Sequence, residues 1–173
     1  HRRAVPLDSP AHLAALIEIR ESLLPSLTHL AKTLRRKARQ FDPVVKLGRT
    51  HLQDATPVRL GQVFAGYATQ IEKGIRRIEA SLPDLSELAI GGTAVGTGLN
   101  RHPRFPRLVC ARLTGELGFA VREAADHFEA QGARDAYVAA SGALKAVAAS
   151  LFKIANDIRF MASGPRAGLA EIL

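Results

Sequence analysis

The chain has 173 residues, a formal net charge of +8 at pH 7, one cysteine and no tryptophan. That length suits a single domain, residues 1–173, with a buried core. A lone Cys110 excludes an internal disulfide framework and is typical of a reducing compartment. No uninterrupted apolar run approaches the roughly 20 residues of a membrane span, so we expect no membrane partner. Alanine and leucine dominate the apolar residues, which favours an all-α fold of closely packed helices.

The positive charge raises the question of a nucleic-acid partner. The densest basic cluster is Arg35-Arg36-Lys37-Ala38-Arg39. It has no interleaved aromatic residues on which bases could stack, and no nucleic-acid motif surrounds it. Cations near the end of a helix also interact favourably with the helix dipole. We therefore interpret the cluster as a solvated helix end and expect no nucleic acid, while a nucleic-acid binder stays open as an alternative that rests on charge alone.

The first segment has the pattern of a long helix. Asp8 or Ser9 can cap its start, with Pro10 in the first turn. Leucines at a four-three-four spacing keep one face apolar: Leu23, Leu27, Leu30 and Leu34. Pro25 removes a hydrogen-bond donor and should bend the helix, and Asp42-Pro43 ends the segment.

A polar stretch, residues 46–57, separates this segment from the next. A compact domain gains nothing by ordering such a loop unless its side chains have partners or a task. Thr50 and His51 place a hydroxyl beside the side-chain type that exchanges protons near neutral pH. Thr56 and Pro57 form the pattern of an N-cap followed by proline at the first helical position. We expect a loop held rigidly against the start of a helix.

The helix that begins at Pro57 should carry one apolar stripe and stop at Pro83. The stripe consists of Leu60, Phe64, Tyr67, Ile71, Ile75, Ile78 and Leu82. Residues 91–100 contain four glycines and two threonines, and a tight connection and a ligand-binding loop are equally good interpretations. No β-strand pattern precedes Gly96-Thr97-Gly98, so a dinucleotide loop or a P-loop fails on context.

Two further helices are predicted, and no strand. The first runs from about Pro106 to Leu117 and ends at Gly118. The second begins at Glu129 and ends before Ser163-Gly164-Pro165. Its apolar positions keep three-four spacing at Leu144, Val147, Leu151, Ile154, Ile158 and Met161. Helices this apolar are more than a small monomer can cover, so we expect a multichain helical bundle.

Several of these stretches resemble class II fumarase, of the fumarase/aspartase superfamily. The resemblance is carried by Gly48-Arg49-Thr50-His51-Leu52-Gln53-Asp54-Ala55-Thr56-Pro57, by Leu60-Gly61-Gln62, by residues 91–100, by residues 153–159 and by Ser163-Gly164-Pro165-Arg166. It extends from about His12 to Ile172. It implies the long-helix bundle of the superfamily's central domain, assembled as a homotetramer whose sites form where three subunits meet.

The resemblance also implies an activity. His51 favours fumarase, because the aspartase branch typically has glutamine there, and Gly91-Gly92 points the same way. The family hydrates fumarate reversibly to L-malate without a cofactor, and we expect no metal site. By resemblance Thr50 contacts the substrate and His51 assists proton transfer, as the catalytic residue.

Other polar residues are expected to have structural roles. Arg49, Gln53 and Asp54 should hold the loop in shape, and Asn156, Asp157 and Arg159 should pair along or between helices. Without motif support, His12, His102 and His127 are expected at the surface or at helix ends.

The sequence also departs from the family pattern. The family has a Ser-Ser-Asn-Asp stretch before the first central helix and a Gly-Ser-Ser-x-Met-Pro-x-Lys-x-Asn loop after the last one, and neither occurs here. We therefore expect a fragment of a cytoplasmic or mitochondrial-matrix fumarase that is inactive as this chain alone. The alternatives are a non-enzymatic helical assembly module and another superfamily lyase, such as aspartate ammonia-lyase.

Overall fold

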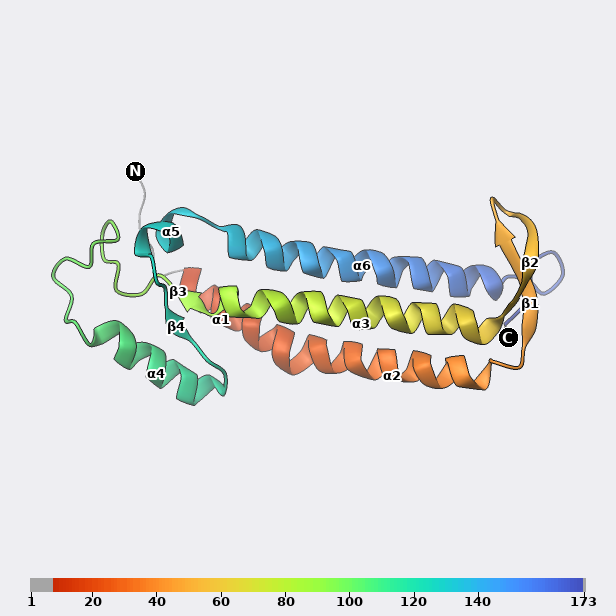
Figure 1. The fold of residues 1–173 in the computed structure, drawn as a ribbon, viewed down its shortest axis with the longest axis horizontal. Coiled ribbons are helices and arrows are strands. Elements are labelled where there is room, and N and C mark those ends of the chain that lie inside the picture. Colours follow the sequence, from red (N-terminus) through yellow and green to blue (C-terminus); the bar gives the residue numbers. More distant parts are fainter. Residues whose placement is uncertain (1–7, 173) are drawn as a thin grey trace. The chain divides into compact units, whose positions relative to one another are not determined.

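The computed structural model describes residues 8–172 and is mostly helical, which confirms the expected all-α class (Figure 1). The described chain divides into two compact units. The first unit contains residues 8–23 and 78–142, and the second contains residues 24–77 and 143–172. The expected single domain stays a prediction.

The second unit consists of three helical segments and a β-hairpin. Helix α2 (Leu24–Gln40), residues 60–77 of α3 (Leu60–Leu85) and residues 143–161 of α6 (Asp135–Met161) lie side by side (Figure 1). Their facing stripes are buried at Leu27, Leu34, Leu60, Phe64, Tyr67, Ile71, Val147, Ile154 and Met161. The apolar stripe predicted for α3 is thus confirmed, because burial of these side chains is what drives the helices together.

The first unit is built from shorter elements: α1 (Asp8–Glu18), a π-helical turn η1 (Ile19–Leu23), β3 (Glu87–Leu88), α4 (Phe105–Leu117), β4 (Arg122–Glu123) and α5 (His127–Gly132). The two-residue strands β3 and β4 pair in parallel. Leu88, Cys110 and Val121 form the buried cluster between them and α4. Gly118 ends α4 with a left-handed φ of 71°, as the sequence predicts.

The π-helical turn immediately precedes the helix that contains Pro25. Proline has no N–H, and its ring collides with the carbonyl four residues earlier, so regular α-helical bonding cannot pass through this point. The chain responds with the wider π-helical bonding over Ile19–Leu23 and resumes as α2 at Leu24. Side-chain capping by Asp8 or Ser9, which the sequence suggests, lies outside the described side chains.

The absence of strands is the first wrong expectation. Residues 45–59 form an antiparallel hairpin of β1 (Val45–Thr50) and β2 (Gln53–Arg59), in place of a polar loop. Thr56 and Pro57 therefore lie in β2, and α3 begins at Leu60. Most side chains of the hairpin are exposed, so it lacks the apolar alternation by which strands are recognised.

The expected helix boundaries are also wrong at two places. Pro83 lies inside α3, which continues to Leu85, because a proline in the last turn costs few hydrogen bonds. The helix expected from Glu129 is split into α5 and α6. Asp126 caps α5 by accepting hydrogen bonds from the backbone of Phe128 and Glu129. Arg134 donates to the carbonyls of Gln131 and Ala133, which stabilises the break between the two helices.

Helix α6 combines great length with little burial. Among the described residues it is the one helix long and apolar enough to cross a membrane, and 17% of its most apolar window is buried. Core helices of soluble proteins have the same length and composition, so this observation does not establish a membrane span. Large apolar side chains stay exposed along it, with Phe152 at 74%. Such a surface favours a protein contact, and the expected multichain bundle stays a prediction.

Candidate functional site

The hairpin β1–β2 carries both predicted site residues at its tip. Thr50 ends β1 and pairs with Gln53, the first residue of β2, so His51 and Leu52 alone form the turn. Both turn residues have left-handed backbones, with φ of 52° and 58°. Positive φ at both central positions is the pattern of a type I′ turn, which usually contains asparagine and glycine. A histidine and a leucine in this turn are strained, by about 1 kcal/mol or more each.

The turn presents its side chains to solvent. Thr50 and His51 are exposed, and Leu52 is 81% exposed. Neighbouring hydroxyl and imidazole groups at a rigid tip can donate hydrogen bonds to an anion and move a proton. Backbone strain of this kind gathers at binding and catalytic positions, so the observed outlier supports a functional interpretation of the tip.

A β-bulge lies just before the tip. The strand register shifts between Leu47 and Arg49, so two residues of β2 oppose Gly48. A Cβ at Gly48 would lie 2.5 Å from the carbonyl oxygen of Thr56, so no larger residue fits there without a backbone shift. The bulge therefore depends on this glycine, and it sets the local twist with which β1 reaches Thr50.

Two cations of β1 bind one carboxylate. Lys46 Nζ lies 2.9 Å from Glu171 Oε2, and Arg49 Nη1 lies 2.7 Å from Glu171 Oε1. The Glu171 side chain is only 14% exposed. Burial is the largest influence on the pKa of Glu171 and raises it, but the hydrogen bonds and charges of Lys46 and Arg49 outweigh it and lower that pKa. The expected structural role of Arg49 is confirmed, whereas the roles of Gln53 and Asp54 stay predictions.

The base of the hairpin is tied to both neighbouring helices. The backbone N–H of Leu60 donates to Val44 at 2.8 Å, and that of Gly61 donates to Phe41 at 3.1 Å. The Gln62 side chain accepts a hydrogen bond from the backbone N–H of Arg59 at 2.9 Å. This bond stabilises the start of α3, where the sequence predicted a cap by Thr56. These bonds fix the base of the hairpin between the end of α2 and the start of α3.

The predicted pairing of polar residues along α6 is confirmed at Asp157. The Tyr67 hydroxyl donates to Asp157 Oδ2 at 2.9 Å, and Lys153 forms an ion pair with the same carboxylate. Burial, followed by the hydrogen bond and charge of Asp157, raises the pKa of Tyr67 well above its usual value. Tyr67 therefore stays protonated at neutral pH and acts as a structural donor between α3 and α6.

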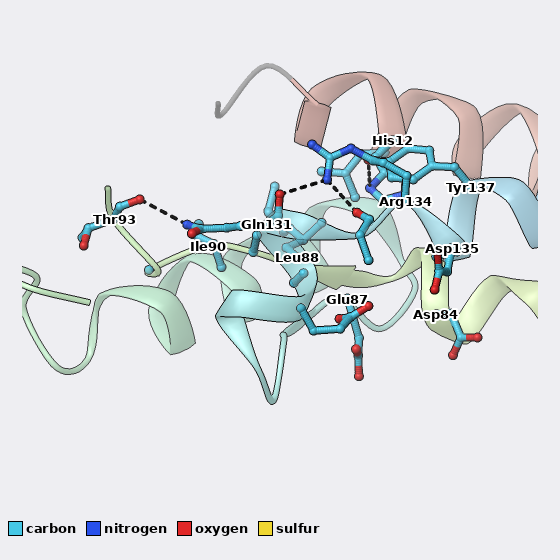
Figure 2. A pocket seen from close by; sticks show the side chains of 18 of the residues that line it. His12, Asp84, Glu87, Leu88, Ile90, Thr93, Gln131, Arg134, Asp135 and Tyr137 are labelled. Carbon is cyan, nitrogen blue, oxygen red and sulfur yellow. Dashed lines mark hydrogen bonds between the residues drawn. The ribbon is translucent and has the colours of Figure 1, made fainter. Parts of the chain in front are cut away.

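Of the three histidines expected at the surface or at helix ends, His12 differs from that expectation. His12 is 7% exposed, its ring stacks on Tyr137 at 3.9 Å, and Nδ1 lies 2.9 Å from the Tyr137 hydroxyl (Figure 2). The expectation of a surface or helix-end position was wrong for His12, because this residue lies inside α1 and an aromatic partner 125 positions away covers it. His127 is the first residue of α5 and so lies at a helix end, as expected, with its side chain largely buried and Nε2 3.0 Å from the Ile90 carbonyl. His102 is exposed, as expected.

The first unit also contains a cavity of about 900 Å³. Figure 2 shows side chains around it from the end of α3, from β3 and from α5. The glycine-rich loop reaches it through Gly91 and Thr93, and Gln131 donates to the Thr93 carbonyl at 3.1 Å. Gly91 has a φ of 92° and leaves no room for a Cβ beside Arg101 and Pro106, so the loop is a tight connection at this point. Sequence analysis gave no sign of this cavity, which residues distant in the chain create.

Within residues 8–172, no group of three or more His, Cys, Asp or Glu side chains is placed to hold a metal ion. The expectation of a site without metal or cofactor stays a prediction.

Comparison with known proteins agrees with the family resemblance that the sequence motifs indicate. The family described as Lyase matches residues 5–173. The chain belongs to this lyase family. It is 58% identical over 161 residues to a class II fumarate hydratase of Neisseria meningitidis, covering 93% of this chain and 35% of that protein. It is 52% identical to the mitochondrial fumarate hydratase of Saccharomyces cerevisiae, covering 94% of this chain and 33% of that protein.

Comparison with a solved structure also places this chain among proteins with the fold of class II fumarases. The class II fumarase of Schistosoma mansoni superposes with a TM-score of 0.88 at 34% identity, covering 92% of this chain and 37% of that one. The resemblance to class II fumarases is therefore confirmed in sequence and in fold. The chain spans about a third of the length of the curated relatives it matches.

Proposed function

We propose that this chain forms part of a fumarate hydratase, which reversibly adds water to fumarate to give L-malate. The observation that carries the proposal is the strained His51-Leu52 turn, which exposes Thr50 and His51 together at the tip of an anchored hairpin. Relatives named class II fumarate hydratase, 52–58% identical to the chain, support the choice of reaction. Aspartate ammonia-lyase is disfavoured because of the histidine at position 51.

The chemistry assigns a task to each tip residue. Hydration places a hydroxide on one alkene carbon of fumarate and a proton on the other, through a carbanion stabilised by the neighbouring carboxylate. In the reverse direction a base takes the carbon-bound proton, an acid protonates the leaving hydroxyl, and donors stabilise the charge on the carboxylate. Thr50 would donate a hydrogen bond to a substrate carboxylate, and His51 would assist proton transfer. No cofactor is needed for these steps.

The proposed assembly follows from the surface of the chain. The tip is exposed, whereas the hydrogen bonds that would stabilise a carbanion act more strongly where bulk water is excluded. A homo-oligomer, a tetramer by resemblance, would cover both the tip and the apolar face of α6. The 173-residue chain, which spans about a third of the length of the relatives named fumarate hydratase, would by itself have no turnover. The proposed location is the cytoplasm or the mitochondrial matrix, and the yeast relative is named as mitochondrial.

The test uses the full gene product and follows fumarate hydration by the loss of absorbance of its double bond. His51→Asn should lower kcat on the order of a hundredfold or more, because general acid–base assistance typically contributes that much. His102→Asn is the matched control, since His102 is an exposed histidine in the other unit. Equal rates for His51→Asn and the unchanged protein would refute the proposal.

Sedimentation of the 173-residue chain tests the assembly separately. Self-association is expected. If the chain sediments as a monomer, the proposal that a homo-oligomer covers the apolar face of α6 is contradicted. An assembly without any turnover in the full gene product would favour the alternative, a non-enzymatic helical assembly module.

A further inference from the structure

We infer that Glu171 is a positioning residue for the site at the hairpin tip: its carboxylate fixes β1 and thereby the placement of Thr50 and His51. This inference rests on the proposed function for its catalytic consequence, while its structural part concerns the hairpin alone. Glu171 lies 120 positions after His51 and belongs to none of the stretches that carry the family resemblance.

The carboxylate bridges two positions of one strand. Each oxygen has its own cation: Oε2 pairs with Lys46 at 2.9 Å and Oε1 with Arg49 at 2.7 Å. The three side chains are between 13% and 22% exposed, so water screens these pairs less than it screens surface pairs. The bridge therefore constrains β1 on both sides of the bulge at Gly48.

The other end of the bridge is fixed to α6. The backbone N–H of Glu171 donates to the carbonyl of Met161, the last residue of α6, at 2.9 Å. The backbone N–H of Ala170 donates to Ser163 at 2.7 Å, so the chain after α6 forms a closed turn. Glu171 thus joins a helix end in the second unit to the strand that carries the tip.

The link from the bridge to the tip is short. Arg49 immediately precedes Thr50, and the strained turn begins one residue later at His51. Left-handed backbone at non-glycine residues persists only where surrounding contacts over-determine it. A displacement of catalytic groups by about 1 Å can cost on the order of a hundredfold in rate, so a small loosening of β1 has a measurable effect.

The geometry also argues against a direct proton-transfer role for Glu171. Both oxygens are occupied by cations, and the paired carboxylate stays ionised at neutral pH because its pKa lies below the ordinary value. A group that must alternate between acid and base needs a pKa near the working pH. The carboxylate is suited to holding the strand.

The test compares Glu171→Gln, Glu171→Asp and Glu72→Gln in the full gene product. Glu72→Gln is the matched control, because it removes another ion pair of the second unit, the one with Arg35 at 2.6 Å between α2 and α3. Hydrogen–deuterium exchange of peptides covering residues 45–59 measures the hairpin, and fumarate hydration over a range of pH measures the site. If Glu171→Gln does not fold, Lys46→Met removes one of the two pairs and is measured instead.

For Glu171→Gln we expect hydrogen–deuterium exchange at residues 45–59 to become faster, on the order of tenfold, because a charged hydrogen bond is lost. We also expect kcat to fall on the order of tenfold with both limbs of the pH profile retained. Glu171→Asp should recover part of both effects, and Glu72→Gln should leave hairpin exchange unchanged.

Two outcomes would overturn the inference. One is that Glu171→Gln changes neither hairpin exchange nor kcat by more than about twofold. Such a change is much smaller than the one expected when a charged hydrogen bond is lost. The other is loss of one limb of the pH profile, which would make Glu171 an acid or a base. If the unchanged gene product hydrates no fumarate while Glu171→Gln still speeds hydrogen–deuterium exchange of the hairpin, the structural role of Glu171 in fixing β1 is supported. The proposed function alone then fails.

Discussion

The Tyr67 hydroxyl and the Asp157 carboxylate meet at 2.9 Å between α3 and α6 in the second unit. Tyr67 is 3% exposed, and Lys153 holds the same carboxylate and lies over the tyrosine ring at 4.8 Å. A buried hydroxyl without an acceptor is costly, so this polar group inside an apolar stripe fixes how the two helices align.

Tyr67→Phe should lower the free energy of unfolding by about 1–2 kcal/mol, because it removes a hydrogen bond to a charged group while keeping the ring. The measurement is urea unfolding at one fixed protein concentration, since association changes apparent stability. Asp157→Asn keeps an acceptor at the same place and should cost less. A Phe variant as stable as the unchanged protein would show that the hydrogen bond makes no net contribution.

Gly48→Ala should destabilise the hairpin. The new Cβ would lie 2.5 Å from the Thr56 carbonyl oxygen, and relief of such a contact requires a backbone shift that costs about 1–3 kcal/mol. Gly66→Ala is the control, because its Cβ would meet nothing within 4 Å and alanine is the better helix former. We expect opposite signs for the two changes in thermal unfolding. Equal effects would mean that the close approach of the Thr56 carbonyl oxygen to residue 48 does not affect stability.

The sequence predicts those parts of the fold that depend on helix periodicity. The stripe from Leu60 to Leu82 and the end of α4 at Gly118 are confirmed, because burial of one face and a left-handed C-terminal residue are both local properties. The break between α5 and α6 was missed, since Arg134 stabilises it through bonds to nearby carbonyls that no composition rule includes.

For the stretch that carries the candidate site, the sequence predicts the candidate residues but not the secondary structure, and their role stays a prediction. Thr50 and His51 were singled out by residue type and resemblance, yet the stretch that carries them was expected to be a loop. A hairpin is usually recognised by Asn-Gly or Asp-Gly between apolar-alternating strands, whereas this one has His51-Leu52 between mostly exposed strands. Glu171 was missed because its partners, Lys46 and Arg49, are distant in the chain, Arg49 and Glu171 being 122 positions apart.

Leu52→Gly should stabilise the hairpin. Leu52 is 81% exposed, so little burial is lost, and glycine adopts its φ of 58° without the penalty of a Cβ. The expected gain is about 1 kcal/mol, the typical cost of one left-handed non-glycine residue, less some backbone entropy. Thermal unfolding measures it, with Leu52→Ala as the control that removes the side chain and keeps the Cβ. A gain for alanine equal to that for glycine would assign the effect to the side chain instead.

Stability should fall in acid partly through Glu171. Its pKa is lowered from the ordinary value of 4.5 in the folded chain, so folding favours the ionised form. That contribution is complete above pH 4.5 and is lost as the pH falls through the folded pKa. The difference in unfolding midpoint between the unchanged protein and Glu171→Gln should therefore be largest at neutral pH and shrink in acid, as the pH falls below the ordinary value of 4.5 and the carboxyl becomes protonated. Urea unfolding at a series of pH values measures it. A difference that stays constant across the series would show that the ion pairs with Lys46 and Arg49 do not stabilise the fold.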